Sequence, residues 1–289
     1  MSKLFLMLAV VFSSPSTVIG GFYVRKTKNY IGAGSLYNLL YIFFAIAGWG
    51  ILFLINGTYN FNVLLFSFAF GLSYSTCQIG TINAIKNGPV LLTSLISSFS
   101  LMVTVIWGFL FWEAEFTVKS VIGLVLVAVS IYFCVYVPQK DKRDKQFSLK
   151  WLIFVLMAFF GNAGCTIFQR TQQMKYNGQY GQFMMFFALL FSFAVCFIMF
   201  LKEKPENTQK IILKAGFLPA LAGAVNVVLN LLVMLLATSE LSPDLIYPAI
   251  GVGGLSISLI MSFVFFREKM SVRQIIGILV GVLAIFLLS

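Results

Sequence analysis

The fold is decided by a seven-residue stretch that occurs twice: Thr117–Gly123 reads TVKSVIG, and Ser271–Gly277 reads SVRQIIG. A second match has the same offset of 154 residues, since Lys86–Pro89 (KNGP) corresponds to Glu240–Pro243 (ELSP). One offset shared by two separate matches indicates an internal repeat. The charge is reversed between the copies of the second match, from Lys to Glu.

The composition places this repeat in a membrane. Sixty per cent of the residues are hydrophobic and 10% are charged. Apolar stretches of about 20 residues recur along the chain, and a helix of this length crosses a hydrocarbon core of roughly 30 Å. A soluble protein of similar length carries many more charges. We therefore predict an all-α integral membrane protein with no room for a soluble domain.

Each copy of the repeat contains five apolar stretches. Because five is an odd number, the second copy must lie upside down in the membrane relative to the first, and inverted repeats are a common architecture of secondary transporters. The predicted units are a first five-helix repeat over 1–138, a charged cytoplasmic linker over 139–148 and a second five-helix repeat over 149–289. The ten transmembrane helices are expected at 3–24, 32–55, 62–85, 89–112, 119–138, 149–170, 180–201, 211–238, 243–266 and 271–288.

The basic residues predict the topology. The net charge is +11, but the Lys and Arg residues lie in short loops, where they set membrane orientation. No folded basic domain is left to hold nucleic acid. Of the 20 basic residues, 16 share the side of the 139–148 linker, and the other four are Lys3, Lys119, Arg170 and Lys175. The positive-inside rule puts the linker side in the cytoplasm and both termini outside.

Catalytic and metal chemistry find little support in the sequence. The four Cys residues all lie in apolar stretches and form no C-x-x-C pair, so we interpret them as small buried hydrophobes. The chain has no His, which removes His-based general acid–base chemistry and His metal ligation. We expect no catalytic residue, no metal site and no cofactor.

Polar residues inside spans are costly unless they face a cavity or another helix. They recur every three or four residues in 62–85, 149–170 and 211–238, and hydroxyl residues gather in 89–112. A similar stripe follows 243–266. The stripes in 62–85 and 211–238, and those in 89–112 and 243–266, occupy equivalent helices of the two repeats, which favours a central cavity between them. The kink expected at one proline and the aromatic side chains able to stack on a ligand add further candidates to these stripes. The candidate substrate-binding residues are Ser14, Pro15, Tyr41, Tyr74, Gln78, Ser94, Ser97, Asn162, Thr166, Gln169, Arg170, Asn226, Asn230 and Tyr247.

An alternative interpretation is that small and hydroxylated residues only let membrane helices pack closely. We favour packing for most Ser and Gly residues, including the G-x-x-x-G formed by Gly277 and Gly281. For Asn162, Asn226 and Asn230 we favour ligand contact, because a buried amide has several donors and acceptors to satisfy.

Residues at the ends of the spans have two interpretations as well. Arg170 could meet a carboxylate or phosphate in the cavity, or it could be a side chain that snorkels from a helix end. We favour the second. Trp112, Tyr136 and Trp151 are interpreted as interfacial belt residues.

One stretch carries a family resemblance. Phe266–Ser271 (FREKMS), followed by Gln274–Gly277 (QIIG), resembles the end of the ninth helix and the start of the tenth in EamA-type transporters of the drug/metabolite transporter superfamily. The usual pattern is Glu, one residue, an apolar residue, Ser or Thr, and a last helix opened by Gly. Pro89 and Pro243, which open the fourth and ninth helices, also fit. The first copy, Glu113–Gly123, departs by one residue in its Glu spacing. The resemblance covers the whole chain, and its motifs identify a fold family but no substrate.

The resemblance implies a central cavity lined by helices one, three, four, six, eight and nine, with helices five and ten as a peripheral scaffold. It also implies alternating access, in a family whose members move amino acids, amines, sugars, nucleotide sugars, organic phosphates and drugs. Many members have cytoplasmic termini. The count of basic residues places both termini outside, and we retain that topology.

These observations predict a secondary active transporter, a permease of a bacterial-type plasma membrane. It would move a small organic metabolite that is neutral, zwitterionic or anionic, such as an amino acid or a drug-like compound, by alternating access. No carboxylate lies well inside a span, so a strongly cationic substrate is disfavoured. A proton is a candidate coupling ion only if a carboxylate at a span end enters the cavity.

Two alternatives stay open. A membrane-embedded enzyme would need convergent titratable groups, which the sequence lacks, and a channel would show no saturable counterflow. The expected partners are the small-molecule substrate and the lipid bilayer, without nucleic acid, and both a monomer and a homodimer are compatible with the sequence.

Overall fold

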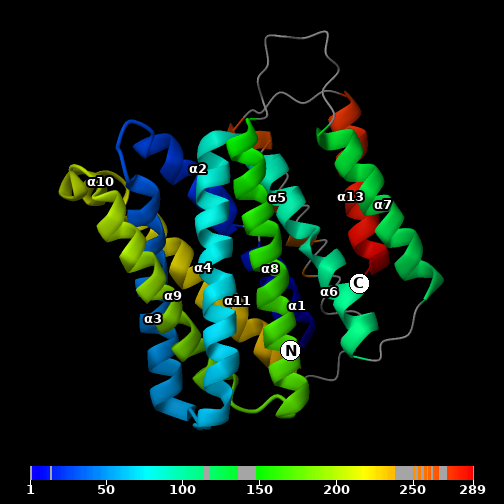
Figure 1. The fold of residues 1–289 in the computed structure, drawn as a ribbon, viewed down its shortest axis with the longest axis horizontal. Helices are drawn as coiled ribbons and strands as arrows, with labels where there is room; N and C mark the ends of the chain where they lie inside the picture. Colours follow the sequence, from blue (N-terminus) through cyan, green and yellow to red (C-terminus); the bar gives the residue numbers. More distant parts are fainter. Residues whose placement is uncertain are drawn as a thin grey trace.

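The computed structural model is a bundle of long helices that run along one common axis (Figure 1). It describes residues 2–13, 15–112, 117–135, 148–237 and 272–288, together with 250, 253–254, 257–258, 260–261 and 263–266. Every regular element in this part of the chain is helical. The all-α prediction is confirmed for these residues.

The helices follow the expected spans closely, although three of those spans are interrupted. In chain order they are α1 (Ser2–Ser13), α2 (Pro15–Thr27), α3 (Ala33–Asn56), the short 3-10 turn η1 (Phe61–Val63), α4 (Leu64–Asn87), α5 (Val90–Ser98), α6 (Ser100–Phe111), α7 (Val118–Val135), α8 (Leu149–Lys175), α9 (Gly181–Glu203), α10 (Thr208–Ala215), α11 (Phe217–Ala237) and α13 (Val272–Leu288).

Within the described residues, six helices or helix pairs are long and apolar enough to cross a membrane, and the bent pair α10–α11 makes a seventh if it is counted as one span. Shorter apolar helices cover Val121–Ser130 and Ile275–Ala284. The ninth expected span, 243–266, lies largely outside the described residues. The chain is thus an integral, multi-pass membrane protein, and the full set of ten spans stays a prediction.

The interruptions have local causes. α1 ends at Ser13 and α2 begins at Pro15, as expected for a proline, which has no amide hydrogen and is well tolerated at the first helical position. The break at Phe99 between α5 and α6 was not expected. Here the hydroxyl of Ser98 donates to the carbonyl of Ser94 at 2.9 Å, and such back-bonding bends helices.

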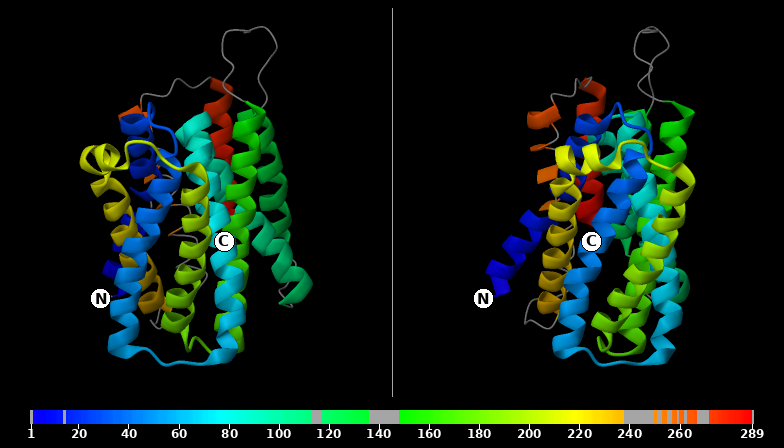
Figure 2. Two further views of the ribbon diagram at one scale, coloured as in Figure 1. Left: turned by 60° about the vertical axis from the view of Figure 1, so that its left-hand side comes forward. Right: turned by 90° about the vertical axis from the view of Figure 1, so that its left-hand side faces the viewer.

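The expected helix 211–238 is instead a bent pair. α10 meets α11 at 60°, with Gly216 as the only residue between them. α10 buries Ile211 and Ala215 and exposes Lys210 and Lys214, and it contacts α2 and α3. It is an amphipathic helix lying across one end of the bundle (Figure 2). The amphipathic sequence, with polar residues on one face, explains why this segment does not continue the span.

The tightest helix pairs are α4 with α8 and α7 with α13. Glycines set the first contact: a Cβ on Gly80 or on Gly161 would lie 2.5 Å from a backbone nitrogen of the facing helix. In the second pair, the buried hydroxyl of Ser130 donates to the carbonyl of Gly277 at 2.6 Å. Small residues and interhelical hydrogen bonds commonly stabilise contacts between membrane helices. This contact agrees with a packing role for Gly277.

The two ends of the bundle differ in charge. α2, α4 and α9 all finish at the upper end in Figures 1 and 2, and their last turns carry Arg25, Lys26, Lys86 and Lys202. α3, α6 and α8 finish at the other end, where the last turn of α8 carries Lys175. We name these the basic end and the opposite end.

Candidate functional site

A hydrogen-bonded pair of tyrosines joins α3 to α4. The hydroxyls of Tyr41 and Tyr74 lie 2.8 Å apart, and the two side chains are only 2% and 8% exposed. Their rings stack with centroids 6.4 Å apart, and Tyr41 also interacts with the side chain of Gln78. The structure therefore brings three predicted site residues together.

Polar contacts also join the helices of the fourth, sixth and ninth expected spans. The hydroxyls of Ser94 on α5 and Ser258 lie 3.0 Å apart. The amide nitrogen of Asn162 on α8 donates to the hydroxyl of Ser100 on α6 at 2.7 Å. Ser97 lies between Ser94 and Ser100 in the sequence. Its hydroxyl is buried and has no hydrogen-bond partner. An uncharged polar seam thus runs between α5, α6, α8 and residue 258.

The remaining polar candidates are satisfied mainly within their own helices. The amide nitrogen of Asn230 donates to the carbonyl of Asn226 at 2.9 Å and to its side-chain oxygen at 3.2 Å. Thr166 donates to the carbonyl of Asn162 at 3.1 Å, and Gln169 is half-buried on the same helix. Pro15 is half-buried at the helix break. Ser14 and Tyr247 lie outside the described residues.

Arg170 lies at the opposite end. Its side chain is exposed, and its guanidinium carbon lies 4.9 Å from the centre of the Trp112 ring. This placement fits the favoured interpretation of a side chain at a span end. The expectation of an interfacial belt fails for Trp151, which is 0% exposed and donates from Nε1 to the hydroxyl of Thr93 at 3.0 Å. It packs against Gly88, which has no side chain, and so turns inward.

Sequence reasoning missed two polar residues. Ser100 binds Asn162, and its position four residues before Thr104 was the available signal. Asn38 on α3 is 2% exposed, and its side-chain oxygen has no hydrogen-bond partner. A single amide in an otherwise apolar stretch gives no periodic pattern, so Asn38 could be found only from the structure.

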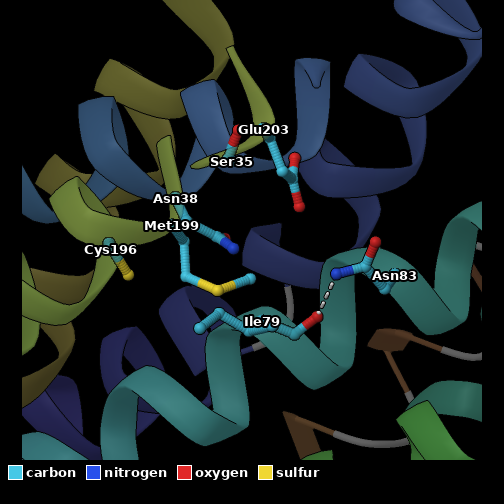
Figure 3. A pocket seen from close by; sticks show the side chains of 7 residues that line it. All are labelled: Ser35, Asn38, Ile79, Asn83, Cys196, Met199 and Glu203. Atoms are coloured by element: carbon cyan, nitrogen blue, oxygen red, sulfur yellow. Dashed lines mark hydrogen bonds between the residues drawn. The ribbon is translucent and has the colours of Figure 1, made fainter. Parts of the chain in front are cut away.

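Asn38 lines a small pocket near the basic end (Figure 3). The amide of Asn38 and the carboxylate of Glu203 point into the space between α3, α4 and α9. The volume open to the centre of a water molecule is about 10 Å³, which is close to the least that holds one water. The lining residues are Ser35, Asn38, Ile79, Asn83, Cys196, Met199 and Glu203.

No residue of the seam or of the tyrosine pair carries a charge. Among the same residues, no group of three or more His, Cys, Asp or Glu side chains could hold a metal ion. Hydroxyls, amides and aromatic rings can donate to, accept from and stack on a polar ligand.

Residues 149–289 match the EamA-like transporter family. This match over residues 149–289 confirms the resemblance found at Phe266–Gly277. No curated protein matches the chain in sequence. In fold, 28 chains of solved structures match. One of them, described only as a crystal structure of a protein, is 14% identical, covers 93% of this chain and 99% of its own length, and has a TM-score of 0.43.

The family assignment sets the broad activity. The match to EamA-like proteins suggests a membrane transporter of the drug/metabolite transporter superfamily. The six to seven apolar helices of spanning length in the described part of the chain agree with that class.

Proposed function

We propose that the protein is a secondary active transporter that moves a small, uncharged or zwitterionic organic metabolite across a bacterial-type plasma membrane by alternating access. The observation that carries this proposal is the neutral polar seam. Ser94, Ser100 and Asn162 bond between helices inside an otherwise apolar bundle, and their groups can exchange partners with a ligand. No residue of the seam is charged, and Arg170 is turned to Trp112, so the seam itself offers an anion no cationic partner.

The helix contacts support the ten-helix inverted repeat that alternating access requires. The exchange applies to the ten expected spans, each being replaced by the span five places away in the chain. It turns the contact of α4 with α8 into the contact of α11 with the first span, α1 and α2. The same exchange relates the contact of α4 with α9 to that of α11 with α3. A repeated set of contacts is the expected result of two inverted copies packed face to face.

The substrate test begins with binding. Purified protein is screened with neutral and zwitterionic metabolites, because a ligand that binds only the folded state raises the melting temperature. Compounds that stabilise the protein are then tested for counterflow in proteoliposomes. Saturable counterflow supports a carrier. Flux without counterflow would indicate a channel, and chemical conversion of the compound would indicate an enzyme.

The site is tested with a matched pair of tyrosines. Tyr74→Phe removes the hydroxyl that bonds Tyr41 and keeps the ring, and we expect about a tenfold loss of ligand affinity, the scale of one lost hydrogen bond. Tyr59→Phe makes the same change at an exposed residue of the loop before η1 and should leave affinity unchanged. Equal affinity in both variants and the wild type would remove the tyrosine pair from the site.

A further inference from the structure

Two arginine–aromatic contacts hold the helices together at opposite ends of the bundle. At the basic end, the guanidinium carbon of Arg25 lies 4.4 Å from the centre of the Phe266 ring, and the guanidinium donates to the Phe266 carbonyl at 2.8 Å. At the opposite end, Arg170 covers the Trp112 ring at 4.9 Å, and Trp112 donates from Nε1 to the hydroxyl of Thr171 at 3.3 Å. We name these contacts the basic-end latch and the opposite-end latch.

The two latches occupy equivalent places in the repeat. Phe266 lies 154 residues after Trp112, which is the offset of the repeated stretches. The arginines are 145 residues apart and so do not share this offset, but each lies near the end of the first helix of its repeat, Arg25 in the last turn of the first span and Arg170 near the end of α8, the sixth. Each latch therefore joins the first helix of one repeat to the fourth helix of the other. Inversion of the repeats explains why the latches lie at opposite ends.

The basic-end latch sits on a closed aromatic contact. The Phe22 ring lies 5.4 Å from that of Phe265 and 5.1 Å from that of Phe266. Gly21 faces the Phe266 ring so closely that a Cβ would overlap it. Phe266 is 5% exposed. The end of the first span therefore packs closely against Phe265 and Phe266 of the ninth.

The strength of these contacts suits a gate. A cation over an aromatic ring changes an equilibrium by roughly 3- to 30-fold, depending on how far it is desolvated. The charged hydrogen bond to the Phe266 carbonyl adds to this at the basic end. A contact of that size can bias a two-state equilibrium and can still be broken in each cycle.

We propose that Arg25 and Arg170 are gating residues: the Arg25–Phe266 latch closes the basic end of the substrate path, and the Arg170–Trp112 latch closes the opposite end. Alternating access then means that one latch opens while the other stays shut. This inference rests on the proposed transport function, but it predicts accessibility changes that can be measured without a substrate.

The test uses two equivalent reporter positions. Thr104 and Ser258 are 154 residues apart, each is 4% exposed, and each lies eight residues before the aromatic residue of its latch. In a background without native cysteines, Thr104→Cys and Ser258→Cys are labelled by a membrane-impermeant thiol reagent added from either side. Arg25→Ala should raise the labelling rate of the Ser258→Cys reporter from the basic end by roughly 3- to 30-fold. Arg170→Ala should do the same for the Thr104→Cys reporter from the opposite end.

Control variants separate gating from loosened structure. Lys26→Ala and Lys175→Ala each remove one positive charge near a latch, where these side chains cover the rings of Phe217 and Phe66 instead. They should leave both labelling rates unchanged. Thr171→Val removes only the hydroxyl that accepts the hydrogen bond from Trp112 Nε1. It should therefore raise the labelling rate of the Thr104→Cys reporter from the opposite end less than Arg170→Ala does.

The latches are supported if Arg25→Ala raises only the labelling of Ser258→Cys from the basic end and Arg170→Ala raises only the labelling of Thr104→Cys from the opposite end. Labelling that rises at both ends in either arginine variant indicates general loosening and overturns the proposal, as does unchanged labelling in both. If the reporters respond as expected but no metabolite is transported in counterflow, the latches stand and the proposed transport function fails.

Discussion

At the scale of the residue, the polar groups of the bundle divide by where their hydrogen bonds go. Ser98 and Thr166 donate to carbonyls of their own helices, whereas Asn162 reaches the hydroxyl of Ser100 on another helix. Ser97 does neither, since its buried hydroxyl has no partner. A buried polar group without a partner costs folding free energy, and under the proposed function a ligand would supply the partner.

Ser97→Ala tests this explanation. We expect the melting temperature of the ligand-free protein to stay the same or rise slightly, because an unpaired buried hydroxyl is removed. Ligand affinity should fall by about five- to tenfold, the effect of one lost hydrogen bond. Ser98→Ala removes a hydroxyl bonded within its own helix and should change neither quantity. A Ser97→Ala protein with wild-type affinity would assign Ser97 to packing.

At the scale of the element, glycines decide how closely helices approach. Gly161 of α8 lies against the backbone of Cys77 on α4, and Gly80 of α4 lies against the backbone at Ala158 on α8. Backbone cannot swing aside as a flexible side chain can. Gly34 of α3 has only ordinary contacts, since a Cβ there would lie 3.7 Å from Ile82 and 3.9 Å from Asn83.

These contacts predict different outcomes for one substitution. Gly161→Ala should destabilise the protein by about 1–3 kcal/mol, because the extra methyl forces two helices apart. Gly34→Ala should be neutral or stabilise by up to about 1 kcal/mol, because alanine favours the helix. Thermal unfolding of both variants in the same detergent measures the difference. A Gly161→Ala protein as stable as Gly34→Ala would mean that α4 and α8 are not held in this contact.

At the scale of the whole molecule, charge sets orientation. Three of the described helices that finish at the basic end, α2, α4 and α9, carry Arg25, Lys26, Lys86 and Lys202 in their last turns, and the expected linker 139–148 adds further basic residues. Cytoplasmic loops carry the excess of Lys and Arg in membrane proteins. The basic end is therefore expected to face the cytoplasm.

Reporter fusions test the orientation. A reporter that is active only in the cytoplasm should be active when inserted in the 139–148 linker and inactive when fused after Ser289. A reporter active only outside should show the reverse. Activity of the cytoplasmic reporter at the C-terminus would invert the topology, or change the number of spans.

The sequence by itself determined the membrane class, most helix positions and the family. These follow from local quantities: the length of apolar stretches, the break at Pro15 and the matched motifs around Gly123 and Gly277. The break at Phe99 and the bend before α11 were missed, because back-bonded hydroxyls and the switch to an amphipathic face are weak signals inside an apolar run.

Partners across helices were decided only by the tertiary structure. Periodicity places Tyr74, Asn162 and Arg170 on helix faces, but it cannot tell which face meets which helix. Folding pairs Tyr74 with Tyr41 and Asn162 with Ser100, turns Trp151 inward, and seats Arg170 on Trp112. The physical reason is that each such contact joins residues tens to hundreds of positions apart, and the close packing of whole helices brings them together.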